Sequence, residues 1–319
     1  MAGVAVGTCW LALLTPSPAL AQGRCGSVAQ RPWCNTALSP QARADLLLAA
    51  LTMQEKISLL GGDDPLTGAG LPGGTGHTGY SAGVPRVGLP GVFYTDGPLG
   101  PRQGQATAMP SPVGLAATWA PGLAYAYGSE VGTEARDKGN DIVFGPTVNI
   151  MRTPLGGRTY EGYGEDPYLD ARTAVGYIEG LQSTGEIADV KHFVANNQEG
   201  YDPTGTTGQP GAPIGVGIED TRYLVDEHID DRTLHEIYMP QFEAAVRQAH
   251  AGTVMCAYNQ VNNAFSCANG HLLQDILRRS WGFDGFVVAD YGAAHDPTAN
   301  LNNGLDFEAW PPWSYQPAE

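Results

Sequence analysis

Polar and charged side chains stand at or just beyond the ends of several short apolar segments: Asp96, Lys191, His192, Tyr258 and Asp290. The clearest case is GFVVADY, residues 285–291, a β-branched apolar run that stops on a carboxylate. A single terminal Asp is commonly a turn former or a helix cap, so Asp290 by itself would suit either structural role. Five such residues at equivalent positions instead indicate one constellation that combines carboxylates, a cation and an imidazole, as active sites do.

The elements that would bring these residues together alternate along the chain. Helix-like stretches at 121–139, 170–185, 233–252 and 270–284 each precede a short apolar strand. Strands that are apolar throughout and alternate with helices predict a parallel sheet covered on both faces. A doubly wound sheet and a barrel both satisfy this pattern. Because no G-x-G-x-x-G or G-x-x-x-x-G-K turn follows a strand, we predict a barrel, in which strand ends gather on one face.

The first part of the chain contains three further features. An apolar segment followed by Ala19-Leu20-Ala21 predicts a signal peptide over 1–21 and a secreted protein, although a buried helix is the alternative. Ser39-Pro40 predicts a helix start, and we expect that helix to continue to Gly61. The Gly-rich stretch 61–83 is expected to be a surface loop.

Composition limits the classes of partner. The 319 residues carry a formal net charge of −16, with 17 Lys and Arg against 33 Asp and Glu. So few cations disfavour nucleic-acid binding, which depends on counterion release. Beyond the N-terminal segment, no stretch is long and apolar enough to span a membrane. The charge is compatible with a neutral substrate.

Four cysteines remain after the predicted signal peptide. They form two local pairs in the sequence, Cys25 with Cys34 and Cys256 with Cys267, and three disulfide pairings are possible. Local pairing closes the shortest loops and fits an oxidising compartment. A zinc site is the rival interpretation, disfavoured because no C-x-x-C pair is present. We therefore predict disulfides and no metal.

Several longer motifs occur in a fixed order between residues 51 and 308: LTMQEKISLL, TDGPLGPR, GPTVNIMRTPLGGRTYEGYGEDPYL, VKHFVANNQE, VMCAYNQVNN and GFDGFVVADYGAAH. Together they resemble glycoside hydrolase family 3, the β-glucosidases and their relatives. The resemblance implies an α/β fold, a TIM-like (β/α)8 barrel incomplete at its C-terminal end. It also implies retaining hydrolysis of terminal β-D-glucosyl residues from a β-linked oligosaccharide or glucoside, without a cofactor.

The resemblance implies roles for individual side chains. The Asp of the motif matched by VVADYG is the family nucleophile, so Asp290 is expected to attack the anomeric carbon. The side chains expected to bind the sugar or line its pocket are Asp96, Arg158, Lys191, His192, Met255, Tyr258 and Tyr291. A retaining glycosidase needs its nucleophile ionised and about 5–5.5 Å from an acid/base group, and neighbouring cations would keep it ionised.

Three of these assignments have structural alternatives. Arg158 would also serve as an ion-pair partner of Glu161 or Asp166, because a buried Arg usually needs a partner. His192 would fit as a buried core histidine, and Met255 as ordinary core.

Domain organisation also follows from the resemblance. Residues 22–319 correspond to the N-terminal barrel domain, and in β-glucosidase-like members the acid/base Glu comes from a second α/β-sandwich domain, expected beyond residue 319. The context VKHFVANNQE lacks the Pro-Gly pattern of N-acetylglucosaminidase members. Residues 200–222 are expected to form a Gly-rich insert over the site. The alternatives are a β-xylosidase of the same family and an inactive sugar-binding fragment.

Overall fold

The computed structural model describes residues 25–62, 77–197, 222 and 225–309. The predicted signal peptide at 1–21 lies outside these residues, as does the predicted insert at 200–222 apart from Arg222. The chain divides into two compact units. The smaller is Met1–Thr52 with Gly83–Pro90, and the larger is Met53–Ala82 with Gly91–Glu319.

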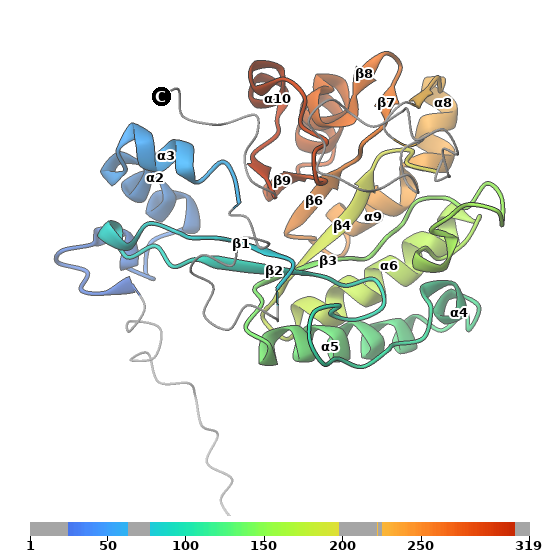
Figure 1. Ribbon diagram of the computed structural model, residues 1–319, viewed down its shortest axis with the longest axis horizontal. Helices are drawn as coiled ribbons and strands as arrows, with labels where there is room; N and C mark the ends of the chain where they lie inside the picture. Colours follow the sequence, from blue (N-terminus) through green and yellow to red (C-terminus); the bar gives the residue numbers. More distant parts are fainter. Residues whose placement is uncertain (1–24, 63–76, 198–221, 223–224, 310–319) are drawn as a thin grey trace, which may run out of the picture. The chain divides into compact units, whose positions relative to one another are not determined.

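The larger unit contains a seven-stranded sheet with the order β1-β2-β3-β4-β6-β9-β10 (Figure 1). The strand bounds are Gly79–Ser81, Val92–Asp96, Ile142–Phe144, Ile187–Phe193, Thr253–Cys256, Phe286–Ala289 and Phe307–Glu308. From β2 to β10 all neighbours are parallel, as predicted, whereas β1 pairs antiparallel with β2. The strand β1 lies within the Gly-rich stretch predicted as a loop, so that prediction was wrong at 79–81. Among the described residues the sheet is a curled half-barrel, consistent with an incomplete TIM-like barrel.

Helices cover the outer face of this sheet. The main helices are α5 (Pro121–Asp137), α6 (Pro167–Gln182), α9 (Pro240–Arg247) and the π-helix η6 (His271–Ser280). Figure 1 shows α5 and α6 side by side along the sheet. They approach closely because glycines face the contact: a Cβ added at Gly180 would lie 2.0 Å from the Tyr125 carbonyl oxygen.

Shorter elements complete the larger unit and form its loops. The helical segments are α3 (Met53–Ser58), α4 (Pro112–Ala116), η3 (Thr159–Glu161), α8 (Asp231–Thr233), η4 (Leu234–Tyr238), η5 (Ser266–Ala268) and α10 (Pro297–Asn303). A separate three-stranded sheet has the order β5-β7-β8, with bounds Asp226–Glu227, Gln260–Val261 and Ala264–Phe265.

Successive residues along each strand face opposite sides of the sheet. Val143, Val190, Val254 and Val287 pack in the large cluster with the covering helices. Ile142, Phe144, Met255 and Val288 form a second cluster on the inner face, together with Tyr94. The inner face therefore also receives the side chains two residues further along, which include the polar residues at the strand ends.

The smaller unit consists of η1 (Pro32–Cys34), α2 (Pro40–Ala50) and η2 (Pro85–Val87). The predicted single helix to Gly61 was wrong, because Leu51 takes an extended conformation and α3 starts anew at Met53. The segment Thr52-Met-Gln-Glu55 has the sequence pattern of a capping box, which favours a new start there.

Both local disulfides predicted from the sequence are present. Cys25 pairs with Cys34 in the smaller unit, and Cys256 pairs with Cys267 in the larger one. The zinc alternative for these cysteines was therefore wrong.

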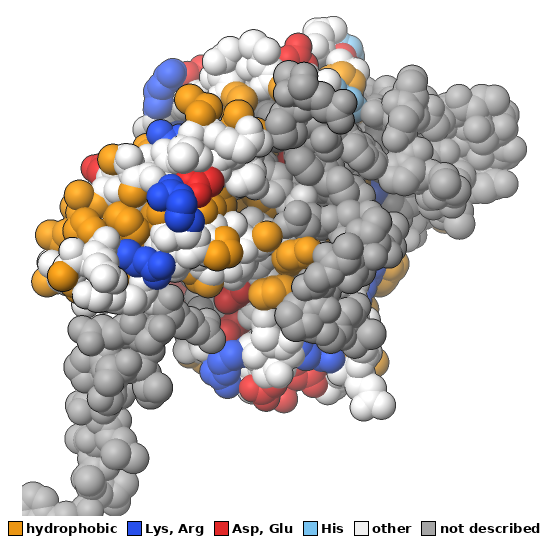
Figure 2. Space-filling view, turned by 60° about the vertical axis from the view of Figure 1, so that its left-hand side comes forward, with side chains coloured by type: hydrophobic (Ala, Val, Ile, Leu, Met, Phe, Trp, Pro, Cys, Tyr) orange, Lys and Arg blue, Asp and Glu red, His pale blue; other side chains and the backbone are white. Residues whose placement is uncertain are grey.

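The described surface in Figure 2 carries charges of both signs. In Figure 2, acidic and basic side chains both occur among hydrophobic ones, and no continuous basic patch is visible among the described residues of that face. No described helix combines the length and hydropathy that crossing a bilayer would require.

Candidate active site

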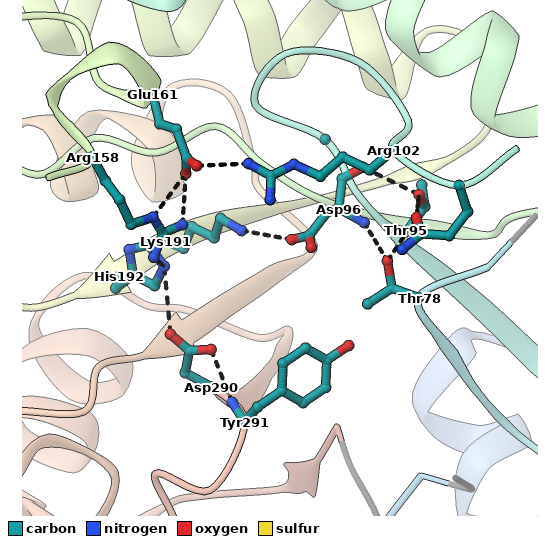
Figure 3. Close-up of polar contacts among 12 residues, drawn as sticks. Thr78, Thr95, Asp96, Arg102, Arg158, Glu161, Lys191, His192, Asp290 and Tyr291 are labelled. Atoms are coloured by element: carbon teal, nitrogen blue, oxygen red, sulfur yellow. Dashed lines mark hydrogen bonds and ion pairs between the residues drawn. The ribbon is translucent and has the colours of Figure 1, made fainter. Parts of the chain in front are cut away.

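Polar and charged residues at the ends of three strands of the sheet, β2, β4 and β9, surround a common centre (Figure 3). Asp96 is the last residue of β2, Lys191 and His192 lie near the end of β4, and Asp290 directly follows β9. Parallel strands place these ends on one side of the sheet, as the sequence predicted. The register between β4 and β6 shifts between Val190 and Phe193, and this irregularity allows both Lys191 and His192 to reach the centre.

Asp96 and Lys191 form a partly buried ion pair, with the Lys191 side chain 3% and the Asp96 side chain 23% exposed and 3.1 Å between Lys191 Nζ and Asp96 Oδ1. Burial would raise the pKa of Asp96, but the positive charges of Lys191, Arg102 and Arg158 together lower it below its ordinary value. The Asp96 amide donates to the hydroxyl of Thr78 on the neighbouring segment, at 2.8 Å. This pair presents a fixed carboxylate and a fixed ammonium side by side.

The sequence suggested Glu161 only as an ion-pair partner of Arg158, and the structure shows that this carboxylate joins two arginines. Glu161 is 1 % exposed and accepts from Arg158 Nη2 at 2.6 Å and from Arg102 Nη2 at 2.7 Å. Burial opposes its ionisation, but Arg158, Lys191 and Arg102 lower the pKa of Glu161 to about 2. The structural alternative for Arg158 is thus confirmed for Glu161, whereas Asp166 instead caps α6. The spacing of Arg158 and Glu161, three residues apart, was the available signal.

His192 is buried and held by Asn149, a residue that sequence reasoning missed. The Asn149 Nδ2 donates to the His192 carbonyl at 2.8 Å, and its Oδ1 accepts from the His192 amide at 2.9 Å. This orientation leaves Oδ1 to accept from His192 Nδ1 at 3.0 Å. Burial, followed by the charges of Arg158, Lys191 and Arg222, lowers the pKa of His192 well below its usual range, so the ring is neutral.

The proton of this neutral ring therefore lies on Nδ1, and Nε2 carries a lone pair. Arg158 Nη1 lies 3.4 Å from Nε2 and donates to it. His192 Nε2 also lies 3.4 Å from Asp290 Oδ2, but Nε2 of the neutral ring carries no proton and therefore donates no hydrogen bond to that oxygen. The histidine is both a satisfied buried residue, as in the structural alternative, and a wall of the centre.

One carboxylate oxygen of Asp290 accepts a hydrogen bond, and the other has no donor among the described residues. Its Oδ1 accepts from the Tyr291 amide at 2.8 Å. No described donor reaches its Oδ2 in hydrogen-bond geometry, although the side chain is buried. The Asp290 amide donates to the Cys256 carbonyl at 3.2 Å, so its backbone is tied to β6. A carboxylate oxygen that no described donor reaches is the kind of group that nucleophilic attack requires.

The remaining predicted side chains occupy the floor and walls. Met255 is 2 % exposed and packs in the inner apolar cluster, which agrees with the core alternative. Tyr291 packs against the same cluster, and Figure 3 shows its ring between Asp290 and Thr78. Tyr258 is also buried, and the guanidinium of Arg222 lies 4.2 Å from its ring centroid. Among the described residues, no group of His, Cys, Asp or Glu has the arrangement of a metal site.

Comparisons with known proteins place this geometry in a family. The model for the glycosyl hydrolase family 3 N-terminal domain matches residues 83–303. A β-glucosidase of Rhizobium radiobacter is 38% identical over 276 residues, which are 84% of this chain and 30% of that protein. An exo-α-(1→6)-L-arabinopyranosidase of Bifidobacterium longum is 38% identical over 278 residues, 83% of this chain and 32% of that protein.

Solved structures give the same result. DesR, a β-glucosidase from Streptomyces venezuelae solved with D-glucose, superposes with a TM-score of 0.71 at 40% identity, over 84% of this chain and 31% of that one. A Kluyveromyces marxianus β-glucosidase in complex with glucose gives 0.73 at 32% identity, over 85% and 30%. The present chain thus spans about a third of the length of these relatives.

Proposed function

The chain belongs to glycosyl hydrolase family 3, and we propose that it supplies the nucleophile and the sugar-binding groups of a secreted enzyme that removes terminal non-reducing β-D-glucosyl residues. In this proposal residues 1–21 are a signal peptide and residues 22–319 are the N-terminal barrel domain. The observation that carries it is the Oδ2 of Asp290, which no described donor reaches in hydrogen-bond geometry and which faces His192 Nε2 at 3.4 Å, in the same centre as the Asp96–Lys191 pair.

The first chemical step is attack by Asp290 Oδ2 on the anomeric carbon of the sugar. The bond from that carbon to the leaving oxygen breaks, and the leaving oxygen takes a proton from a general acid. Water then gives a proton to the deprotonated acid, which now acts as a base, while the water oxygen attacks the anomeric carbon of the glycosyl-Asp290 intermediate. The bond to Asp290 breaks and releases its carboxylate, so the configuration is retained. The neutral His192 and the fixed cations of Arg158 and Lys191 surround the nucleophile without competing for its free oxygen.

Sugar binding in this proposal depends on the charged pair and its neighbours. Carboxylate and ammonium groups form charge-assisted hydrogen bonds with hydroxyls, so Asp96 and Lys191 would bind neighbouring hydroxyls of the pyranose. Arg158 and His192 would contact the next hydroxyls around the ring. Met255, Tyr258 and Tyr291 would form the apolar surface beneath and beside it.

The general acid is assigned to a group outside the described residues. An acid must hold its proton at working pH, whereas the pKa of Asp96 and that of Glu161 are both lowered by neighbouring cations. Neither carboxyl of the centre can therefore donate to a leaving group at neutral pH. No organic cofactor or metal enters the proposal.

Trapping of the covalent intermediate tests this function. The full-length protein is incubated with a slow 2-fluoro-β-glucoside, digested, and analysed by mass spectrometry. Label is expected on the peptide containing Asp290, is expected to be lost in Asp290→Asn, and is expected to persist in Asp284→Asn, which removes an exposed carboxylate from the same segment.

Three other results would point elsewhere. Label on a different carboxylate contradicts the role of Asp290. A complete absence of label with bound glucose would support the inactive sugar-binding alternative. Faster labelling by the corresponding xyloside would favour a pentopyranosidase, an option raised by the arabinopyranosidase relative.

A further inference from the structure

A second carboxyl group lies beneath the candidate site, inside the sheet. Asp189 precedes Lys191 by two residues on β4, so both side chains face the inner side of the sheet. Asp189 is 0 % exposed and stands opposite Thr253 of β6, which in turn stands opposite Phe286 of β9. The apolar inner cluster of Met255, Val288 and their neighbours lies on the same face.

This carboxyl lacks the partners that a buried anion needs. Within the described residues, no hydrogen bond of ordinary geometry reaches either oxygen of Asp189. The neighbouring Thr253 hydroxyl lies near enough to lower the pKa of Asp189, but its hydrogen bond of ordinary geometry goes to the Ala188 carbonyl at 3.3 Å. Burying an unpaired carboxylate costs so much free energy that such a group usually takes up a proton.

The charged groups that face Asp189 come from three strands. Lys191 lies on its own strand, Asp96 on β2, and Asp290 beyond β9. The facing side chains of β3 and β6 in the described structure, Ile142 and Phe144 and then Thr253 and Met255, do not titrate. The only cation of the set is already paired with Asp96 at 3.1 Å.

The ion pairs of the centre form without Asp189. Arg102 and Arg158 pair with Glu161, and Lys191 pairs with Asp96. An ionised Asp189 would add another carboxylate next to Lys191. It would compete with Asp96 for the ammonium and repel both Asp96 and Asp290.

We propose that Asp189 is a positioning residue, a neutral carboxylic acid beneath Lys191 that keeps this lysine on Asp96, and that its ionisation weakens sugar binding at alkaline pH. The effect on sugar depends on the function proposed above, whereas the protonation of Asp189 does not. Asp189 is not the general acid, because its complete burial beneath Lys191 separates it from the leaving oxygen.

The expected pH range follows from the surroundings of the carboxyl. Burial raises the pKa of Asp189 to about 8; the hydroxyl of Thr253 and the charge of Lys191 lower it, and Asp290 and Asp96 raise it. The acid form therefore prevails at neutral pH and is lost above about pH 8. If only the acid form binds sugar, the apparent Kd rises about tenfold for each further pH unit.

Two measurements on the full-length protein test the proposal. Infrared difference spectra at pH 6 report the carbonyl band of a protonated acid without any ligand. Titration calorimetry with D-glucose, a neutral ligand, gives Kd from pH 6 to pH 9.5. The variants are Asp189→Asn, with Asp189→Thr as a second version, and Asp170→Asn as the matched control, because Asp170 is also a buried acid but lies on α6.

We expect the wild-type acid band of Asp189 to disappear in both Asp189 variants. We also expect the alkaline rise in Kd to be present in wild type and Asp170→Asn and absent in both Asp189 variants. An unchanged alkaline rise in the Asp189 variants overturns the proposal, as does a wild-type spectrum at pH 6 without the Asp189 band. A protein that binds no glucose at any pH contradicts the proposed function instead, and the acid band alone then decides the assignment of Asp189.

Discussion

Asp170 offers a test of buried-charge energetics in the scaffold, away from the candidate site. It lies in the first turns of α6, is 0 % exposed, and neither of its oxygens is reached by a hydrogen bond from the described residues. Burial, with a smaller contribution from Asp166, raises the pKa of Asp170 from 3.8 to about 9. We predict that Asp170→Asn changes the pH dependence of stability.

The sign follows from proton binding. Between pH 3.8 and about 9 the folded protein holds a proton on Asp170 that the unfolded chain has released. The contribution of this group to stability is therefore complete at low pH and is lost as pH rises through that interval. Each pH unit corresponds to about 1.4 kcal/mol. Over three units, from pH 5 to pH 8, wild type should lose about 4 kcal/mol relative to a variant that does not titrate.

The assay is urea unfolding of wild type and Asp170→Asn at pH 5, 6, 7 and 8. The difference in the free energy of unfolding should shift steadily in favour of the variant as pH rises, whatever its value at pH 5. The control is Asp137→Asn, which removes a carboxylate with 72% of its side chain exposed and should give a difference nearly independent of pH. A constant difference for Asp170→Asn would refute the reasoning.

Two further substitutions address the site and the helix packing. Glu161→Gln removes the carboxylate shared by Arg158 and Arg102 and should lower the free energy of unfolding by about 3 kcal/mol at pH 7. This is the low end for a broken buried pair, because the Arg102 side chain is 43% exposed. The loss should shrink as pH falls from 4.5 toward about 2, where the wild-type carboxylate also loses its charge. The exposed pair of Glu236 and Arg232 supplies its control, since Glu236→Gln should cost less than about 0.5 kcal/mol, and equal costs would contradict the argument. Gly180→Ala should destabilise by about 1–3 kcal/mol in the same assay, because its Cβ would lie 2.0 Å from the Tyr125 carbonyl oxygen, whereas Gly122→Ala, with nothing within 4 Å, should stabilise by up to about 1 kcal/mol. If Gly180→Ala and Gly122→Ala changed the free energy of unfolding by similar amounts, the close packing of α5 against α6 would not limit the side chain at Gly180.

Strand-end residues were predictable because of a geometric rule. Parallel strands terminate on one side of a sheet, so residues such as Asp96, Lys191 and Asp290 converge whatever the details of their connections. The sequence pattern did not predict the first strand of the described sheet. This strand, β1, is antiparallel and comes from a Gly-rich segment that has no apolar run to mark it as a strand.

Residues contributed by loops were harder to place. Glu161 and Asn149 follow β3, and their positions depend on the path of the loop rather than on a local period. Asp189 was concealed for another reason. A charged residue inside an otherwise apolar strand gives no sign of the face it occupies until the register of the neighbouring strands is known.

The disulfide at the end of β6 has a consequence for the proposed nucleophile. Cys256 pairs with Cys267 and, through its carbonyl, accepts the amide of Asp290. The backbone of Asp290, the proposed nucleophile, is therefore one hydrogen bond away from a covalent crosslink, which limits the thermal motion of this strand end. In a reducing compartment that restraint would be lost, so the precision of attack is linked to the redox potential under which the chain folds. A protein made in a reducing cytosol and the same protein made in an oxidising compartment would then differ in how firmly the backbone of Asp290 is held, although their sequences are identical.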